Sequence, residues 1–447
     1  MKEKLHRVLG GADIFFLAFG AMVGWSWVVL AGEWLTGAGF VGAALAFAIG
    51  GSVIALIGLT YAELASAMPY AGGEHVYVER AFGPTVSFFA TWAIVLGYVS
   101  VVCFEAIALP VALVYLFPDL RQIPLWNVAG YDVYLTEILI GSFAAALICG
   151  LNIIGVQAAS FVQKVVIILV LAAGVFLITG GFVSGERPAG TWVSDVGGVA
   201  GVLVMTPFLF VGFDVIPQSA EEIKLPKRKI GTILITSIVF ATIFYIGVMI
   251  AVGFAPISPG MDHKGLAAAD AANALWKSEK AGAFVILAGV AGILTSWNAF
   301  LIGGSRALFA MARAGQLPSF LGRVHPRYST PYGAILLIGL LALLAPLLGR
   351  NALIWLVNAG GFGIIIAYFC VAVSFLALRI KEPEMERPYR APAGFLVGTI
   401  AAVLSLALAA LYMPGSPAAL LWPHEWGLVA GWGFLGLAAH YAASRRH

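Results

Sequence analysis

Gly20-Ala21-Met22-Val23-Gly24-Trp25-Ser26-Trp27 lies within an apolar run from about residue 12 to residue 31, which is long enough to cross a bilayer. Its two glycines stand four residues apart, and glycine inside a helix costs about 1 kcal/mol relative to alanine. Backbone that unwinds at bilayer depth must line a cavity or be buried in protein, because lipid offers it no hydrogen bonds. We therefore expect the first helix to break here and the break to form half of a binding site. A glycine notch for close helix packing is the alternative, and this stretch alone does not decide between them.

The composition is that of a polytopic membrane protein. Of 447 residues, 61% are hydrophobic and 11% are charged, with a mean hydropathy of +0.97, whereas soluble domains carry about 25% charged residues. The N-terminus is charged but lacks a short apolar core with a cleavage site, so we expect a cytoplasmic tail rather than a signal peptide. Cys103, Cys149 and Cys370 lie in apolar runs without disulfide or metal spacing, and we expect them to contribute to packing.

Apolar runs separated by breaker residues predict twelve membrane spans. They lie near residues 12–31, 40–66, 84–115, 135–152, 160–182, 199–222, 231–254, 282–312, 331–348, 352–378, 394–412 and 426–443. Placing the N-terminus in the cytoplasm puts 19 of the 25 Lys and Arg residues on the cytoplasmic side and six on the other. This excess predicts a multi-pass protein of the cytoplasmic membrane with both termini in the cytoplasm.

The sixth span offers a partner for the break in the first. Its stretch 207–217 (PFLFVGFDVIP) places Gly212, Asp214 and Pro217 in mid-span, after aromatic residues. Five spans precede it, and a repeat with an odd number of spans must run inverted in its second copy. We expect a single membrane domain over residues 1–447, with repeats at about 8–182 and 199–380 and two accessory helices at about 394–443.

Three acidic residues in the apolar segments have more than one possible role. A carboxylate at bilayer depth costs about 2.5 to 3.5 kcal/mol, so it must face a cavity or a partner. Asp214 is expected either to cap the second half of the sixth helix, to bind freed amides of the break, or to accept from a substrate ammonium. Glu105 is either protonated and paired, a proton carrier, or an anionic contact for a cationic substrate. Glu33, near the outer end of the first helix, is expected at a solvated mouth.

Hydroxyl and amide side chains in the eighth and tenth spans are weaker candidates. Thr295 and Ser296 would form an oxygen-lined sodium site if they faced unwound carbonyls of the first helix, but bonds to their own helix backbone are favoured. Asn298 and Asn358 either reach the cavity or join helices. No nucleotide loop, zinc pattern or nucleophile elbow stands out, so we expect no certain metal site, no cofactor and no nucleic acid partner.

Four motifs in order resemble the amino acid permeases of the amino acid–polyamine–organocation (APC) superfamily. They are 61–69 (YAELASAMP) with 72–77 (GGEHVY), 210–214 (FVGFD) with 220–226 (AEEIKLP), 305–315 (SRALFAMARAG) with 317–318 (LP), and 387–390 (RPYR). The resemblance covers nearly the whole chain. It implies an all-α, leucine-transporter-like fold with twelve transmembrane helices and two inverted five-helix repeats, in which helices 1 and 6 are broken.

The resemblance also implies where a substrate binds. Its carboxylate would lie on free amides of helix 1, and its ammonium on freed carbonyls near Ala21 and Phe210. An aromatic residue of helix 6, Phe208 or Phe213, would close over it. The implied substrate residues are Ala21, Met22, Val23, Gly24, Trp25, Ser26, Phe208, Phe210, Val211, Gly212, Phe213, Asp214 and Asn298.

Two departures from the family pattern affect specificity and coupling. After Gly24 the family usually has a small residue and then glycine, where this chain has Trp25 and Ser26. The indole ring either narrows the pocket or supplies a cation–π face. Some proton-coupled members carry a lysine in helix 5, where our alignment places Val170, while Lys164 falls earlier. The coupling ion is therefore open.

We expect a secondary active transporter that moves a small amino acid across the cytoplasmic membrane by alternating access, coupled to H+ or Na+ or working by exchange. The alternative is an importer of a putrescine- or ethanolamine-like amine, which Glu105, Glu33 and Trp25 suggest. An integral-membrane enzyme would need paired acid–base or metal ligands at one membrane face, and no His, Asp and Glu cluster has that spacing. The expected partners are the substrate, the coupling ion and the lipid bilayer. The oligomeric state is not assigned.

Overall fold

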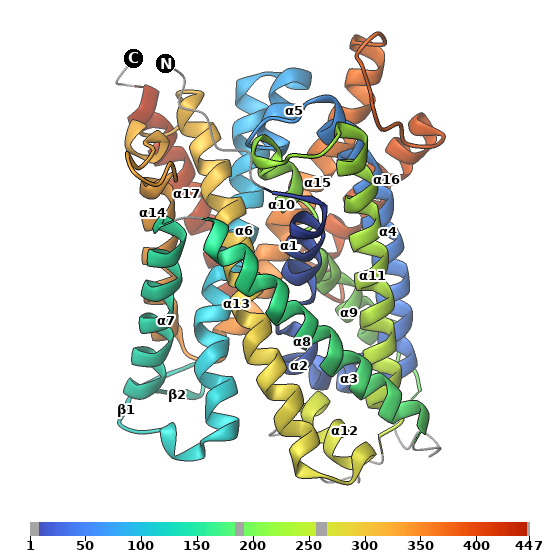
Figure 1. Ribbon diagram of the computed structural model, residues 1–447, viewed down its shortest axis with the longest axis vertical. Coiled ribbons are helices and arrows are strands. Elements are labelled where there is room, and N and C mark those ends of the chain that lie inside the picture. Colours follow the sequence, from blue (N-terminus) through green and yellow to red (C-terminus); the bar gives the residue numbers. More distant parts are fainter. Residues whose placement is uncertain (1–8, 155, 184–191, 256–265, 445–447) are drawn as a thin grey trace.

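The computed structural model describes residues 9–154, 156–183, 192–255 and 266–444, and the side chains of 156–162 lie outside that description. The described chain is a helical bundle with one small antiparallel hairpin (Figure 1). The helices and strands are α1 Gly11–Val23, α2 Ser26–Val29, α3 Ala31–Ala38, α4 Phe40–Ala67, α5 Glu74–Phe82, α6 Pro84–Leu116, β1 Pro124–Val128, β2 Tyr131–Tyr134, α7 Leu135–Ile154, α8 Val156–Val183, α9 Val196–Phe210, α10 Val215–Gln218, α11 Lys227–Gly253, α12 Ala267–Trp276, α13 Glu279–Arg313, α14 Tyr332–Leu344, α15 Ala352–Lys381, α16 Gly394–Leu411 and α17 His424–Ser444.

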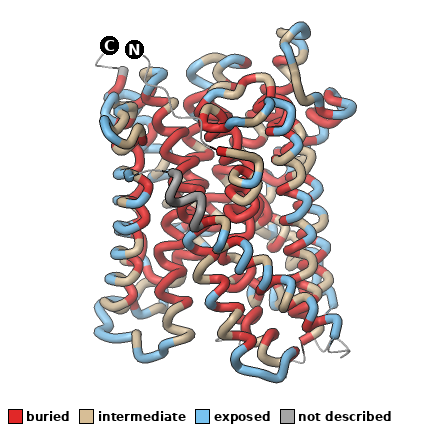
Figure 2. Tube along the Cα trace, viewed as in Figure 1, coloured by how far each residue is buried: buried red, intermediate tan, exposed pale blue. Residues whose placement is uncertain are grey.

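Ten helical segments among the described residues are long and apolar enough to cross a membrane. They match ten of the twelve expected spans, and the expected span at 331–348 is a shorter apolar helix, Tyr332–Leu348. Residues 426–443 also form a helix, α17, although it is not among the ten. The interior of the bundle is buried, and large apolar side chains such as Phe143, Phe182 and Phe434 lie exposed on its outside (Figure 2). Such a surface suits lipid, so the protein is a multi-pass membrane protein.

The first helix is interrupted where its glycines predicted. Helix α1 ends at Val23, and Gly24 takes φ 25° and ψ −131°, which favours glycine. The chain resumes as the four-residue helix α2 and then α3. All residues from Gly20 to Gly24 are buried. The interruption therefore lies inside protein, as unwound backbone at bilayer depth requires.

The sixth expected helix is interrupted in the same way and meets the first. Helix α9 ends at Phe210, Gly212 has φ 132°, and α10 begins at Val215. A Cβ atom on Gly212 would lie 2.6 Å from the Cβ of Ala21 and 3.0 Å from the amide nitrogen of Met22. The two breaks are thus in direct backbone contact, and glycine is required at 212 both for its φ and for its lack of a side chain.

A short main-chain pairing also joins the start of α1 to the segment after α10. The Leu9 amide donates to the Glu222 carbonyl at 2.9 Å, and the Lys224 amide donates to the Leu9 carbonyl at 2.9 Å. Buried Arg306 of α13 donates to the Glu222 carboxylate at 3.0 Å. The start of α1 is therefore joined to the segment that follows α10.

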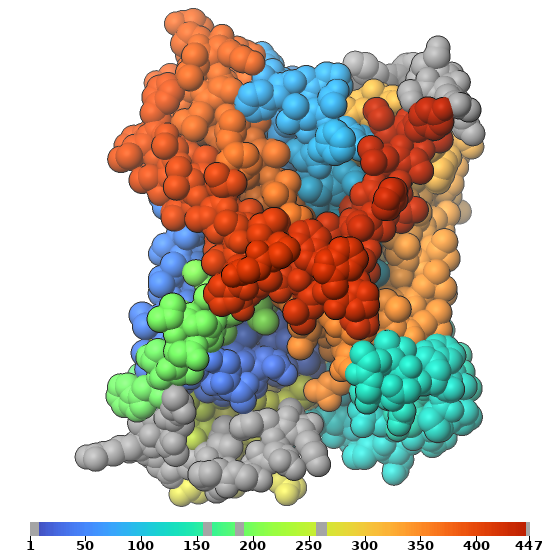
Figure 3. All heavy atoms as spheres, turned by 180° about the vertical axis from the view of Figure 1, so that it is seen from behind, coloured from blue at the N-terminus to red at the C-terminus, as the bar shows by residue number. Residues whose placement is uncertain are grey.

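The C-terminal helices lie on the outside of the bundle, where the orange-red and red residues cover the face shown in Figure 3. Helix α17 is held to α6 by two reciprocal bonds of 2.8 Å, in which the indole of Trp92 donates to the Trp432 carbonyl and the indole of Trp432 to the Trp92 carbonyl. Tyr412, just after α16, donates to the Val204 carbonyl of α9. These contacts hold α16 and α17 to the bundle from outside.

Replacing Gly212 by alanine tests the contact between the two breaks. A side chain there meets Ala21 and must hold a strained φ, so we expect Gly212→Ala to lower stability by about 1–3 kcal/mol. Thermal unfolding of the purified protein in detergent measures the change. Gly201→Ala, in the preceding helix α9 with nothing within 4 Å of the added Cβ, is the control and should not destabilise. Equal melting temperatures for the two variants would contradict the close approach.

Candidate functional site

A cavity with about 280 Å³ of empty space lies at the break of the first helix. It is enclosed by α1, α2, α6, α9 and α13. The lining residues are Ala21, Met22, Gly24, Trp25, Ser26, Val101, Phe104, Glu105, Phe208, Leu209, Ser296 and Phe300. Eight of the twelve are residues that the sequence singled out, and Val101, Phe104, Leu209 and Phe300 were not foreseen.

The two breaks leave backbone groups free, and three of the residues that carry them, Ala21, Trp25 and Ser26, line this cavity. The amides of Trp25, Ser26 and Trp27 donate to no group within the described part of the chain. The carbonyls of Ala21 and Phe210 likewise accept no hydrogen bond from described residues. Buried backbone groups are rarely left without partners, so free donors and acceptors at a cavity indicate a polar ligand. Amides suit an anionic group and carbonyls a cationic one.

Trp25 is a wall of the cavity. Its side chain is fully buried, and a Cβ atom on Gly289 of α13 would lie 2.2 Å from the indole ring. The ring therefore occupies the space that this glycine leaves open. Its Nε1 has no partner in the described chain. The indole narrows the cavity from the side of α13 and keeps one donor available.

Tyr245 of α11 fixes the backbone around the break. Its hydroxyl donates to the Met22 carbonyl at 2.6 Å and lies 2.8 Å from the hydroxyl of Ser26, which therefore donates to it. It also lies 3.4 Å from the Leu209 carbonyl at the end of α9. The ring stacks on Phe47 with 4.7 Å between centroids. The sequence analysis missed this residue, and the only signal was a tyrosine in the middle of an apolar span.

Glu105 places a carboxylate in the wall of the cavity without a basic partner. Its side chain is 2% exposed. Ser296 donates to Oε1, and Oε2 has no partner among the described residues. None of the residues lining the cavity is Lys, Arg or His. A carboxylate at this depth needs a proton or a cationic group beside it, because burial penalises the isolated charge.

Asp214 binds the freed backbone of the second break. Its Oδ1 accepts from the Gly212 amide at 2.7 Å, and its Oδ2 accepts from the Tyr98 hydroxyl at 2.7 Å. It makes no side-chain cap to α10, so the expectation that it caps the second half-helix is wrong. The reason is local: Gly212 turns its amide back toward the carboxylate. Asp214 lies outside the lining of the cavity, as do Val23, Phe210, Val211, Gly212 and Phe213.

The two aromatic candidates for a gate have different positions. Phe208 lines the cavity and contacts Phe104, with 5.8 Å between ring centroids. Phe213 packs between Tyr61 and Tyr368, with centroid distances of 5.3 Å to each. Of the two, Phe208 is the ring that a ligand in this cavity would touch.

Thr295 and Ser296 use their hydroxyls mainly within their own helix. The Thr295 hydroxyl donates to the Gly292 carbonyl of its own helix at 2.8 Å and lies 3.4 Å from the Gly20 carbonyl. The Ser296 hydroxyl donates to the Glu105 carboxylate of α6. Among the described residues no group of three or more His, Cys, Asp or Glu side chains is placed to hold a metal ion.

Two of the remaining polar residues, Asn298 and Lys164, lie near the N-terminal part of α1, and Asn358 lies elsewhere. Asn298 accepts from Asn152 at 2.9 Å and donates to Gln163 at 3.2 Å, next to a second cavity with about 280 Å³ of empty space. Lys164 pairs with Asp13 at 2.5 Å. Asn358 donates to Glu425 at 2.6 Å. Val170 of α8 is buried. The α8 side chain that lies closest to Gly20 is that of Ile167. Asn298 and Asn358 thus join helices.

Comparison with known proteins gives the family. The profile of the family described as "Amino acid permease" matches residues 9–435, nearly the whole chain. The chain belongs to this family. The motifs at 61–77, 210–226, 305–318 and 387–390 all lie within the match.

Several members of the permease family are similar to this chain. It is 27% identical to the branched-chain amino acid permease BcaP of Bacillus subtilis over 413 residues, which cover 88% of this chain and 85% of the relative. It is 26% identical to the methylthioribose transporter of Bacillus subtilis, covering 100% of this chain and 95% of the relative. The aspartate-proton symporter of that species is 26% identical, over 88% of this chain and 77% of the relative. All three are transporters or permeases by name.

Removing the Tyr245 hydroxyl tests its role at the break. Tyr245→Phe leaves the Met22 carbonyl without its donor, so we expect a loss of about 1 kcal/mol in unfolding free energy. Unfolding of the purified protein in detergent measures it. Tyr70→Phe, whose side chain is exposed, is the matched control and should leave stability unchanged. A Tyr245→Phe variant as stable as this control would contradict the bridging role.

Proposed function

We propose that this permease is a secondary active transporter that moves a small amino acid across the cytoplasmic membrane by alternating access. The observation that carries the proposal is the cavity at the first break, which is lined by residues with a free backbone amide, Trp25 and Ser26, and by one with a free carbonyl, Ala21. An α-amino acid has a carboxylate and an ammonium on one carbon, and the two sets of free groups complement them. The proposed contacts are the amides of Trp25, Ser26 and Trp27 and the carbonyls of Ala21 and Phe210.

The proposed cycle rests on the breaks. Two inverted repeats, at about 8–182 and 199–380, would each contribute one broken helix, and the site would open to either side as the broken helices tilt. Both termini would lie in the cytoplasm, on the side with most of the Lys and Arg residues. Phe208 would close over the substrate.

For coupling, the contacts support a proton at Glu105 rather than sodium at Thr295 and Ser296. The Glu105 carboxylate has one oxygen without a partner among the described residues and no basic residue in the cavity lining, and a proton would neutralise it. Exchange of one substrate for another is the other coupling mode consistent with this site.

Glu105 also favours a second candidate substrate, an amine or polyamine. A cationic group beside the free oxygen of Glu105 would supply the missing charge in place of a proton. Trp25 would then offer its ring face to the cation. An integral-membrane enzyme gains no support, because the similar proteins are named as transporters and permeases.

Uptake by reconstituted protein separates the two substrates. In liposomes we expect saturable uptake of a labelled neutral amino acid, and accelerated uptake when unlabelled amino acid is trapped inside, because an alternating carrier exchanges. Neutral amino acids should compete with the label and putrescine should not. Competition by putrescine without competition by neutral amino acids would establish the amine importer instead.

Glutamine at position 105 tests the coupling proton. Glu105→Gln keeps the size of the side chain but cannot cycle a proton, so we expect a several-fold loss of accumulation driven by a pH gradient, with exchange retained. Glu33→Gln, on exposed Glu33 of α3, is the control. Unchanged pH-driven accumulation in Glu105→Gln rules the role out.

Replacement of sodium by choline should change nothing; a loss of uptake would restore the sodium site at Thr295 and Ser296.

A further inference from the structure

A second, separate pocket lies at the end of the bundle that we propose to be cytoplasmic. It encloses about 420 Å³ of empty space between the end of α15 and the start of α16. Three arginines line it, Arg379, Arg387 and Arg390, together with Pro383 and Phe395. None of these residues lines the substrate cavity. The loop that joins α15 to α16 lies at the upper right of the bundle in Figure 1.

Three arginines and no acidic residue line this pocket, and Glu384 and Glu386 of the same loop are exposed and lie outside the lining. Buried Glu63 accepts from Arg379 at 3.0 and 2.5 Å and lies 3.0 Å from Arg387, so one carboxylate serves two guanidinium groups. The other donors of Arg387 are taken by main-chain carbonyls. Arg390 is exposed and has no carboxylate within ion-pair distance in the part of the chain that the structure describes. Nearby Glu382 is already paired with Arg80 at 2.7 Å.

The start of α16 adds to the positive potential. A Cβ atom on Gly394 would lie 2.0 Å from the guanidinium carbon of Arg379, so glycine lets this cation lie directly against the helix start. No side chain caps the free amides of this 18-residue helix. A cation beside a helix N-terminus is electrostatically unfavourable unless an anion lies next to both. The protein supplies one such anion here, the Glu63 carboxylate that accepts from Arg379.

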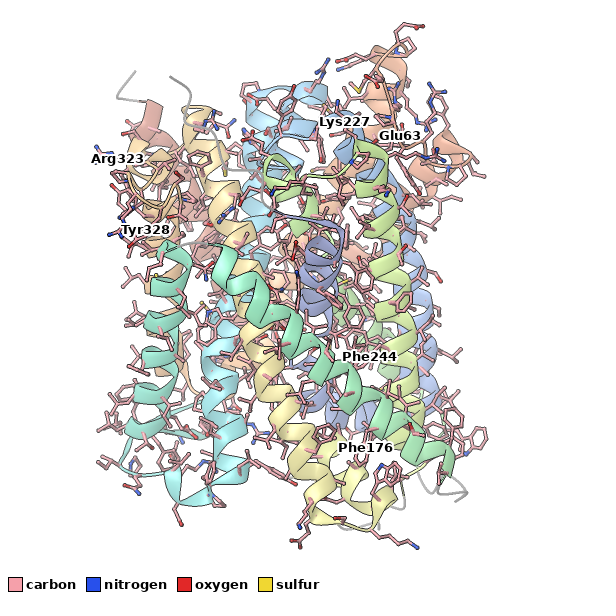
Figure 4. All side chains as sticks on the ribbon, viewed as in Figure 1. Glu63, Phe176, Lys227, Phe244, Arg323 and Tyr328 are labelled. Carbon is pink, nitrogen blue, oxygen red and sulfur yellow. The ribbon has the colours of Figure 1, made fainter. Side chains whose placement is uncertain are left out.

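Further basic residues extend the charge along the rim. Tyr389 packs against Gly231 of α11, and the exposed Lys227, Arg228 and Lys229 begin that helix. Figure 4 shows Lys227 and Glu63 at the same end of the bundle, and Arg323 at the opposite side of that end. Basic clusters where helices leave the cytoplasmic leaflet attract anionic lipid headgroups.

An apolar strip leads from the pocket along α16. Phe395 stands at the pocket and is 53% exposed, and Leu396, Val403 and Leu406 follow on the helix with exposures of 62%, 59% and 57%. Helix α16 is one of the ten candidate spans, so this strip faces the bilayer. We propose that the pocket of Arg379, Arg387 and Arg390 binds the phosphate of an anionic phospholipid, whose acyl chains lie along this strip.

Lipid titration of the full-length protein in detergent tests the site. Dioleoyl phosphatidylglycerol should raise the melting temperature in a saturable manner, whereas dioleoyl phosphatidylcholine and inorganic phosphate should not. Arg390→Gln removes the one guanidinium without a protein partner and leaves the Glu63 pairs intact. We expect it to weaken phosphatidylglycerol binding about fivefold while the melting temperature without lipid stays the same.

Arg323→Gln, an exposed arginine at the same end but away from the pocket, is the matched control and should bind phosphatidylglycerol like the natural chain. Undiminished binding by Arg390→Gln, or an equal loss in Arg323→Gln, overturns the proposal. A melting shift with inorganic phosphate as large as that with phosphatidylglycerol overturns the lipid assignment and leaves a site for a free anion. None of these readouts depends on transport.

Discussion

The structure depends on one constraint: main-chain groups at bilayer depth must have partners. Two helices break in the interior, and each break finds its partners in the other or in a neighbouring helix. Gly212 approaches the backbone of Ala21 and Met22, Asp214 binds the Gly212 amide, and Tyr245 binds the Met22 carbonyl. Of the residues whose backbone groups remain free, Ala21, Trp25 and Ser26 line the cavity. Unwound backbone therefore lies where protein groups or a bound ligand can supply its hydrogen bonds.

The two carboxylates near the breaks have opposite environments. Asp214 accepts from a hydroxyl and an amide, and so it is part of the structural framework. Glu105 accepts from a single serine and keeps one oxygen bare in the cavity wall. Position in the span does not separate these cases, because both are lone acids in apolar segments. What separates them is the number of donors that other helices bring.

The sequence predicted the broken helices and the cavity well because glycines and lone polar residues in apolar runs are local signals. Gly24, Trp25, Ser26, Glu105 and Phe208 do meet at one cavity. Contacts between distant segments could not be foreseen. Tyr245 looked like any aromatic residue of a span, and the direction of the Asp214 side chain depends on how Gly212 turns. Phe213 could not be separated from Phe208 without knowing that Tyr61 and Tyr368 enclose it.

The pairing of Leu9 with Glu222 and Lys224 has a mechanical consequence. Helix α1 and the segment that contains α10 contact each other at Gly212 and again at this pairing. Because they are joined at two places, neither can move independently of the other. Force applied to one passes to the other through main-chain bonds. The two main-chain bonds of the pairing do not use the side chains of Leu9 and Lys224, but proline at either position would remove an N–H donor.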